Sequence, residues 1–273
     1  MKRFIAFLVI LVIAFASTGC GSSNNGKNDP NEPVAASDLL ARIKERGYIV
    51  IATEGNWSPW TFHDDAGKLT GLDVEIGKRL AEELGVDVKF EETDWDSILY
   101  GVDTGKYDIA CNGVGYTDKR AEKYSFSTPY VYTHKVLVVR ADNDSIRSVE
   151  DLKGKTTANT ASSTYADLAK QYGATVTPVN TLAETIELLD NGTVDATINA
   201  QVSINNYLEQ NPEANIKIVQ VLPGEPVAFP MRKTEDAASL VAAIDEIIND
   251  MRSSGELAKI SKKFFGMDLT NPD

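Results

Sequence analysis

Residues 107–130, YDIACNGVGYTDKRAEKYSFSTPY, contain the strand, turn and helix start on which our interpretation of the whole chain is based. The apolar run 109–111 predicts a short buried strand, and the Asn- and Gly-rich segment 112–115 ends it. A helix is predicted to begin at Thr117, whose hydroxyl can accept from a first-turn amide. Arg120 falls in that first turn, where a positive charge is unfavourable, so we expect another purpose for it. Its guanidinium is well placed to bind a carboxylate, and the alternative is a solvated surface arginine.

Two consecutive motifs in this stretch resemble those of a known protein family. The pattern Gly-x-x-x-Thr-Asp-Lys-Arg at 113–120, followed by Tyr-Ser-Phe-Ser-Thr-Pro-Tyr at 124–130, resembles the family 3 periplasmic-type solute-binding proteins. These are polar amino-acid receptors of ABC importers, and the resemblance extends from Leu39 to Gly266. It implies an α/β, two-lobed periplasmic-binding-protein-like fold of type II, with two crossover strands and a ligand cleft between the lobes. It also implies a receptor that closes on an amino acid, catalyses no reaction and serves a membrane permease.

Short apolar strands alternate with amphipathic helices along the rest of the chain. Tyr48–Ala52 is a continuous apolar run, which is typical of a strand buried on both faces. Leu72–Leu84 repeats leucine or isoleucine every fourth residue, which predicts a helix. Further strands are predicted at 86–90, 136–139, 156–158, 175–179, 194–198 and 216–219, and further helices at 98–102, 148–154, 163–172, 182–189, 202–208, 237–253 and 256–265. Such alternation predicts βαβ units and largely parallel sheets.

The alternation falls into two series, which predict two α/β lobes. We expect lobe 1 to comprise residues 38–135 and 226–273, and lobe 2 to comprise residues 136–225. The chain would cross between them near His134–Asp142 and Pro223–Met231, and the C-terminal helices would return to lobe 1. Because ligands of open α/β sheets bind beyond the carboxyl ends of the strands, each lobe should offer these ends to the cleft.

The N-terminus has the pattern of a secretion signal. Two basic residues precede an apolar core at 4–16, which is shorter than the about 20 residues that span a bilayer. The Ser-Thr-Gly-Cys that ends at Cys20 resembles a bacterial lipobox, so we expect residues 1–19 to be a lipoprotein signal peptide. Residues 21–33 contain almost no apolar side chains, and we expect residues 20–37 to form a flexible tether. The protein would then be extracytoplasmic and anchored to the cell membrane through lipid on Cys20; the alternative is an ordinary signal peptide that contains a cysteine.

Composition argues against several classes of function. The net charge of −13 at pH 7 argues against nucleic-acid binding, which needs clustered basic residues. With Cys20 lipidated, Cys111 has no partner for an intramolecular disulfide, and its apolar neighbours favour an inert, packed thiol. His63 and His134 are far apart, and no cysteine or histidine spacing resembles a metal site. We expect a monomer without metal, cofactor or catalytic residues.

An aromatic slot is predicted in the first lobe. The resemblance implies that the loop after the strand at 48–52 supplies Trp57, which stacks on the ligand, and Glu54, an acid that faces it. Trp95 occupies the place of a second, opposing aromatic residue. Two facing aromatics form an apolar slot that can also accept a cation. Core packing is the alternative for both residues, and it is the role that we expect for Trp60.

A carboxylate site is predicted beside that slot. The resemblance implies that Arg120 clamps the α-carboxylate and that the backbone of Gly113 faces the α-ammonium. Relatives usually carry serine or threonine two residues after that glycine, whereas this chain has Gly115. Asn112 and Tyr116 are candidates to compensate for the missing hydroxyl.

A second-lobe segment at 160–164, TASST, would complete the clamp. Its hydroxyls and the first-turn amides of the predicted helix favour anion binding, and simple helix capping is the alternative reading. The resemblance implies that Ser163 and Thr164 are the contacting residues, with Thr160 beside them.

Ala200 departs from the pattern of the family. Many relatives carry an aspartate there that holds the α-ammonium, and a buried ammonium without an acceptor is costly. Glu54, Asn199 and the Gly113 carbonyl are the candidate replacements, and Asn199 with Gln201 could meet a second zwitterion.

The predicted ligand is an amino acid, with L-cystine first, another neutral polar amino acid second and a basic one third. Segments 157–165 and 198–202 resemble the cystine-type branch. No lysine or second arginine can be placed at the far end of the slot, which argues against glutamate and aspartate. Glu54 and the acidic composition leave a basic ligand open.

Two other functions remain open at this stage. The same fold houses cyclohexadienyl dehydratases, which would bind a carboxylate with Arg120 and Ser163 and use Glu54 as a general acid of raised pKa. A sensory lipoprotein that signals through a partner is a third reading. The predicted anchor and tether favour the receptor that delivers its ligand to ABC permease subunits.

Overall fold

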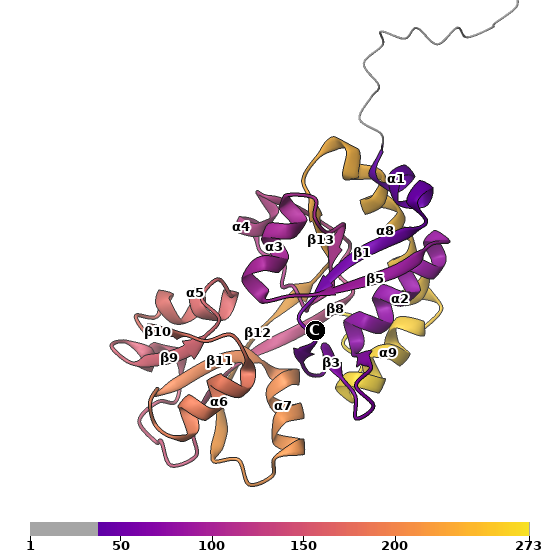
Figure 1. The fold of residues 1–273 in the computed structure, drawn as a ribbon. Helices are drawn as coiled ribbons and strands as arrows, with labels where there is room; N and C mark the ends of the chain where they lie inside the picture. The colour runs from indigo at the N-terminus through magenta and orange to yellow at the C-terminus, as the bar shows by residue number, and fades with distance from the viewer. Residues whose placement is uncertain (1–37, 273) are drawn as a thin grey trace, which may run out of the picture. The chain divides into compact units, whose positions relative to one another are not determined.

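A three-stranded parallel sheet forms the centre of the first lobe. The computed structural model describes residues 38–272, and its first sheet has the order β5-β1-β6. The strands are β1 (Tyr48–Thr53), β5 (Asp87–Glu92) and β6 (Ile109–Ala110), and the helices are α1 (Leu39–Arg46), α2 (Leu72–Leu84), α3 (Trp95–Asp103), α8 (Ala238–Ser253) and α9 (Glu256–Phe265). Ile49 and Ile51 of β1 share a core with α1, α2, α8 and α9, whereas Val50 and Ala52 pack with α3. Alternate residues of β1 are thus buried on opposite faces, which explains why helices cover both (Figure 1).

A five-stranded mixed sheet forms the second lobe. Its order is β10-β9-β11-β8-β12. The strands are β8 (Val131–Arg140), β9 (Thr156–Asn159), β10 (Thr175–Pro178), β11 (Ala196–Ala200) and β12 (Ile216–Val227), and the helices are α5 (Thr164–Gln171), α6 (Leu182–Asp190) and α7 (Gln201–Gln210). Leu137 and Ile198 belong to the core on the α5 side, and Val136 and Val138 belong to the core on the side of α6 and α7. This sheet is therefore also buried on both faces.

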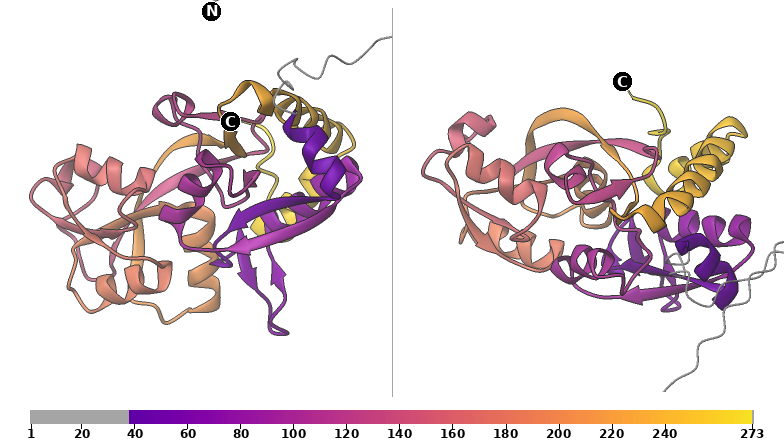
Figure 2. Two further views of the ribbon diagram at one scale, coloured as in Figure 1. Left: turned by 45° about the horizontal axis from the view of Figure 1, so that its top comes forward. Right: turned by 90° about the horizontal axis from the view of Figure 1, so that it is seen from above.

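The two long strands β8 and β12 connect the lobes. They pair antiparallel from Val131↔Val227 to Arg140↔Ile216, with register shifts in β12 near Ile218 and Val221. Figure 2 shows them side by side. Their first-lobe ends carry Val131 and Val227 into the core of that lobe, and α8 and α9 complete it. The described residues belong to one compact unit, so this is the two-crossover arrangement that the sequence predicts.

Short elements close the loops between the main strands and helices. They are β2 (Asn56–Trp57), β3 (Thr61–His63), β4 (Leu69–Thr70), β7 (Tyr124–Phe126), β13 (Pro230–Arg232), α4 (Asp118–Ala121) and the 3₁₀ helices η1 (Val149–Leu152) and η2 (Glu235–Ala237). Thr117 caps α4 by accepting from the Arg120 amide at 3.1 Å, which confirms the helix start inferred from residues 107–130.

The main predicted elements are confirmed, with shifts at their ends. The predicted strand at 86–90 starts one residue later and runs to Glu92, and the strand at 216–219 extends through the whole crossover to Val227. The extension occurs because β12 keeps pairing with β8 between the lobes, where the sequence has no alternating apolar pattern. The lobe boundaries at 135/136 and 225/226 remain a prediction. Two core clusters contain only second-lobe residues, whereas the first-lobe core also includes Ala200 and Val202 of the second lobe.

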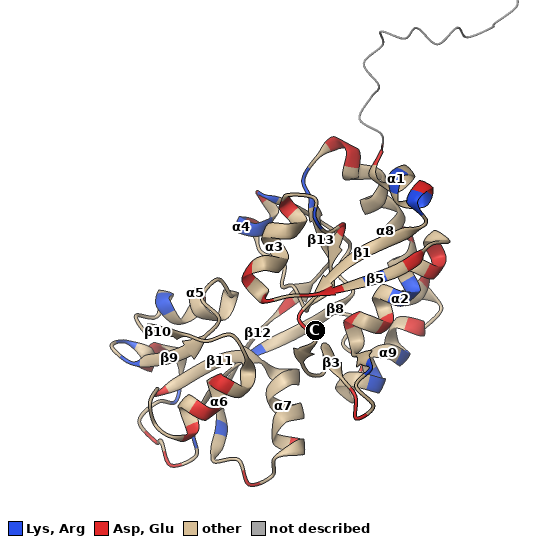
Figure 3. Cartoon of the chain, in the orientation of Figure 1, with Lys and Arg blue, Asp and Glu red and all other residues tan. Residues whose placement is uncertain are grey.

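The surface carries both signs of charge. Figure 3 shows acidic and basic residues interspersed over the helices and loops of both lobes. None of the helices within residues 38–272 is sufficiently long and apolar to span a membrane. The predicted signal peptide, Cys20 and the tether lie outside the described residues.

Candidate functional site

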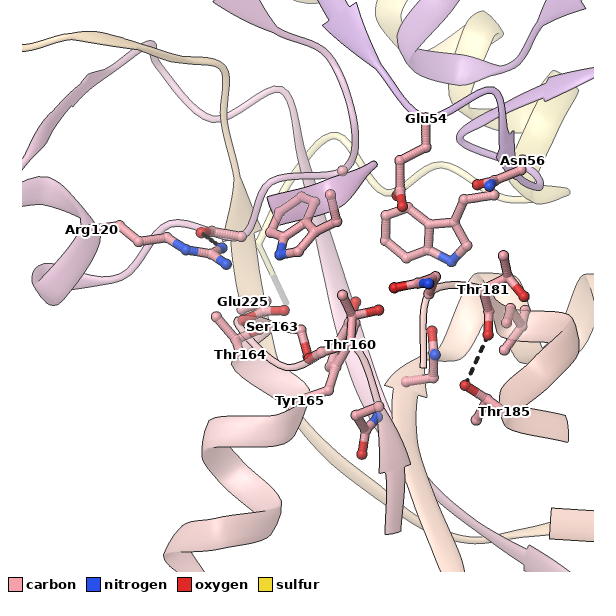
Figure 4. A pocket seen from close by; sticks show the side chains of 18 residues that line it. Glu54, Asn56, Arg120, Thr160, Ser163, Thr164, Tyr165, Thr181, Thr185 and Glu225 are labelled. Atoms are coloured by element: carbon pink, nitrogen blue, oxygen red, sulfur yellow. Dashed lines mark hydrogen bonds between the residues drawn. The ribbon is translucent and has the colours of Figure 1, made fainter. Parts of the chain in front are cut away.

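A pocket lies between side chains of the two lobes, as Figure 4 shows. The first lobe and the crossover strand β12 supply Glu54, Asn56, Trp57, Trp95, Gly113, Gly115, Arg120 and Glu225, and the second lobe supplies Asn159, Thr160, Ser163, Thr164, Tyr165, Asn180, Thr181, Leu182, Thr185 and Asn199. Most of these residues follow the carboxyl ends of strands or begin helices, which is where open α/β sheets bind ligands.

The indole ring of Trp57 forms one wall of the pocket, and Trp60 packs against it from the core. Trp57 stacks on Trp60, with ring centroids 5.5 Å apart, and Trp60 is fully buried in the core, as predicted. Gly113 adopts a left-handed φ of 57°, and a β-carbon there would stand 2.7 Å from the Trp57 ring and 2.9 Å from Trp60. Only glycine therefore fits beneath this wall without displacing an indole.

A buried carboxyl supports the same turn. Asp73 accepts hydrogen bonds from the Gly113 amide at 2.5 Å and from the Tyr130 hydroxyl at 2.8 Å. Burial raises the pKa of Asp73 to about 7, although both hydrogen bonds oppose the rise. Cys111 is buried nearby, and burial raises the pKa of its thiol, which agrees with the inert thiol that the sequence predicts.

Glu54 places a carboxyl at the pocket itself, after the end of β1. The Asn112 side chain donates to its Oε2 at 2.6 Å and accepts from its backbone amide at 2.8 Å. Burial raises the pKa of Glu54 to about 7, the hydrogen bond from Asn112 lowers it, and the charges of Asp94 and Asp96 raise it further. The group is therefore poised to change its charge near neutral pH.

Arg120 is the cationic end of the pocket. Its Nη1 donates to the Gly115 carbonyl at 2.9 Å, and its guanidinium carbon lies 5.2 Å from the centroid of the Trp95 ring. Within the described part of the chain, no carboxylate forms an ion pair with it. Burial lowers the pKa of the guanidinium from its ordinary value. A desolvated cation without an anionic partner is suited to bind a ligand carboxylate.

The start of α5 faces the same space from the second lobe. Ser163 donates to the Thr160 carbonyl at 2.7 Å and accepts from the Ala166 amide at 3.1 Å. Its hydroxyl therefore caps the helix, as the alternative reading proposed, while the first-turn amides of Thr164 and Tyr165 have no acceptor among the described residues. Capping by Ser163 and anion binding by these amides are compatible.

Comparison with known proteins places the chain in a family. Residues 49–267 match the family model described as "Bacterial extracellular solute-binding proteins, family 3". The chain belongs to this family. The L-cystine-binding protein TcyA of Bacillus subtilis (strain 168) is 37% identical, and the similarity covers 97% of this chain and 97% of TcyA.

Solved structures give the same assignment. The L-cystine solute receptor of Neisseria gonorrhoeae, in an unliganded open conformation, is 37% identical with a TM-score of 0.58 over 86% of this chain and 100% of that chain. An ancestral arginine-binding protein bound to arginine is 35% identical with a TM-score of 0.75 over 81% of this chain and 99% of that chain. This solute-binding protein therefore has the two-lobed type II fold. The proteins named here are binding proteins or receptors rather than enzymes, in agreement with the expectation of no catalysis.

Nine of the twelve ligand-binding residues predicted from the sequence line the pocket of this solute-binding protein: Glu54, Trp57, Trp95, Gly113, Arg120, Thr160, Ser163, Thr164 and Asn199. Three do not. Asn112 is buried behind Glu54, Tyr116 packs its exposed ring against Phe126, and Gln201 lines a different hollow, beside Val202 and Phe264. Whether any of the twelve contacts a ligand stays a prediction.

Several pocket residues escaped the sequence analysis. Asn159, Asn180, Thr181 and Thr185 line its second-lobe end. Asn159 ends β9, Asn180 and Thr181 precede α6, and Thr185 lies within that helix, so their local positions do not mark them as pocket residues. Glu225 lies on the crossover strand, and nothing in its neighbours, Gly224 and Pro226, marks it as a cleft residue. Among residues 38–272, no cluster of three or more histidine, cysteine, aspartate or glutamate side chains could hold a metal ion.

Proposed function

We propose that this solute-binding protein captures an amino acid in the pocket, with L-cystine as the first candidate, and delivers it to the permease of an ABC importer. The observation that carries the proposal is the arrangement of polar groups along the pocket. Figure 4 has Arg120 at one end and Thr181 and Thr185 at the other, and the Trp57 and Trp95 rings also line the pocket. An α-carboxylate would bind Arg120 and the first-turn amides of α5.

L-Cystine suits both the middle and the far end of this pocket. Its disulfide is polarisable and would lie against the Trp57 and Trp95 rings. Its second ammonium would meet Glu54, and its second carboxylate would meet the amide and hydroxyl groups of Asn180 and Thr181. The whole-length similarity to the L-cystine-binding protein TcyA supports this choice.

A thermal-shift screen of all amino acids, with cystine kept under oxidising conditions, tests the proposal. We expect L-cystine to raise the melting temperature most, because ligand binding stabilises the folded state by mass action. The same sample with a reductant should show no shift, since cysteine lacks the second zwitterion. A protein that no amino acid stabilises would contradict the function itself.

A basic amino acid is the second candidate, and Glu54 is the specific observation in its favour. A carboxyl that becomes an anion near neutral pH at the pocket wall can accept a guanidinium or ammonium. The structural similarity to an ancestral arginine-binding protein supports the same reading. A shift with arginine or lysine but not with cystine would replace the first candidate by this one.

We also propose that lipid on Cys20 anchors the protein to the cell membrane. The support is the Ser-Thr-Gly-Cys motif followed by a polar segment. Cys20→Ser should move the protein from the membrane fraction to the medium or periplasm and leave ligand affinity unchanged, because Cys20 is not among the residues that line the pocket. Fractionation followed by immunoblotting measures this, with Cys111→Ser as the matched control. A Cys20→Ser protein that stays with the membranes would refute the anchor.

A further inference from the structure

The pocket contains a second acid whose position differs from that of Glu54. Among its lining residues only Glu54 and Glu225 are acidic. An amino acid carries its α-carboxylate and α-ammonium on one carbon, so an acid that accepts this ammonium must lie close to the group that binds the carboxylate. The question is which of the two acids lies beside Arg120.

Gly115 lies next to both Arg120 and Glu225. Arg120 donates to the Gly115 carbonyl at 2.9 Å. A β-carbon on Gly115 would stand 3.1 to 3.2 Å from three atoms of the Glu225 carboxylate. Of the charged groups that act on Arg120, Glu225 has the largest effect, yet the two side chains do not form an ion pair. Their charges are thus near each other without direct contact, and Figure 4 draws both facing the pocket.

Lys135 holds Glu225 in place and leaves part of it available. The Lys135 ammonium donates to Oε2 of Glu225, and the side chains are only 15% and 13% exposed. No described residue donates to Oε1. A carboxylate can accept several hydrogen bonds, so Oε1 can accept from a ligand while Oε2 remains bound to Lys135.

The sheet explains why the acid comes from β12. Lys135 of β8 lies opposite Ala200 of β11, and Glu225 of β12 lies opposite Thr133, two residues along β8. Residues two apart point to the same face of a strand, so Ala200, Lys135 and Glu225 share one face. Ala200 offers no acceptor on one side of the lysine, and Glu225 supplies the carboxylate on the other.

We propose that Glu225 accepts the α-ammonium of the bound amino acid while Arg120 binds its α-carboxylate. The proposal rests on the proposed function. Glu225 then determines specificity for α-amino acids over the corresponding carboxylic acids without an amino group. The competing role is structural, in which Glu225 serves only to neutralise the buried ammonium of Lys135.

Paired ligands with and without amino groups test the proposal by calorimetry. The probes are L-cystine with 3,3′-dithiodipropionic acid, and L-arginine with 5-guanidinovaleric acid. For the full chain we expect the amino acid to bind about tenfold or more tightly than its analogue. Glu225→Gln should remove most of this preference by weakening the amino acid alone. Asp144→Asn, which breaks an exposed ion pair of 2.9 Å with Lys217, should leave it unchanged.

The double variant Lys135→Gln, Glu225→Gln separates the two roles, because it leaves no unpaired buried charge and should fold even if Glu225→Gln does not. We expect it to lack the preference for the amino group. A double variant that regains wild-type binding, or a folded Glu225→Gln that keeps the preference, would overturn the proposal and leave the proposed function intact. A wild-type protein that binds no amino acid in the screen would overturn both.

Discussion

Arg120→Ala is expected to weaken amino-acid binding by at least about tenfold, or roughly 1.4 kcal/mol. The side chain of Arg120 is half-buried, its guanidinium lies against Trp95, and it has no ion-pair partner among the described residues. A ligand carboxylate in the closed pocket would therefore lose its principal counter-charge. Truncation of one partner of a buried, hydrogen-bonded charge pair typically costs about 2–5 kcal/mol, so the effect can exceed this minimum.

Isothermal titration calorimetry measures the effect, and Arg140→Ala is the matched control. Arg140 pairs with Asp142 at 2.6 Å on the exposed surface of the second lobe, and exposed pairs contribute little. Its loss should leave affinity unchanged. An Arg120→Ala protein with normal folding and near-normal affinity would mean that this arginine is a structural residue only.

The second large effect concerns pH. Affinity for cystine or a basic amino acid should fall by about tenfold between about pH 8 and about pH 6, because a group of pKa about 7 passes from mostly ionised to mostly protonated over that range. The ionised Glu54 accepts the ligand cation, and the protonated form does not. Binding should therefore release protons below pH 7, which calorimetry in buffers of different ionisation enthalpy detects.

Two variants assign the pH effect to this residue. Glu54→Gln should flatten the dependence, whereas Glu91→Gln, at an exposed carboxyl of β5, should retain it. Burial also raises the pKa of Asp73 to about 7, so among the described residues Asp73 is the alternative source of the effect. If Glu54→Gln keeps the pH dependence of affinity of the wild-type protein, the effect would have to be assigned to Asp73 instead of Glu54.

The stability of the ligand-free protein should respond to pH in the opposite direction. Burial raises the folded-state pKa of Glu54 and Asp73 above the unfolded values. Their contribution to the free energy of unfolding is fully present below about pH 4 and is lost as pH rises through about 7. As pH rises toward 7, the ligand-free protein should therefore become less stable while its affinity for the ligand increases. Thermal melts with and without ligand can separate these two effects.

The local pattern of the sequence predicts the fold well, because the spacing of apolar residues and the capping residues that define a helix or strand lie within that element or next to it. Leucine or isoleucine at every fourth residue of Leu72–Leu84 predicts α2 with the bounds that the structure has, and the hydroxyl of Thr117 marks the start of α4. Arg120 was predictable for a related reason, since its place in a first helical turn is locally unfavourable and needs another explanation.

The residues that escaped prediction depend on pairing between distant segments. Glu225 reaches the pocket because β12 pairs with β8 and because Gly115 leaves space for its carboxylate. No pattern within a few residues of Glu225 contains that information. The same holds for Asn159 at the end of β9 and for Thr181, which caps α6.

The second lobe has two core clusters of its own, and this has a consequence for the order of folding during export. The cores of the second lobe use only residues from Val136 to Leu222, whereas the first-lobe core joins Leu39 to Ala200, Val202 and Phe265. A chain that leaves the cell N-terminus first has the whole second lobe outside before α8 and α9 appear. We therefore expect the second lobe to fold while the first is still an open chain, because contacts distant in sequence form last. Binding activity, and resistance to extracellular proteases, would begin only when the last 35 or so residues have emerged.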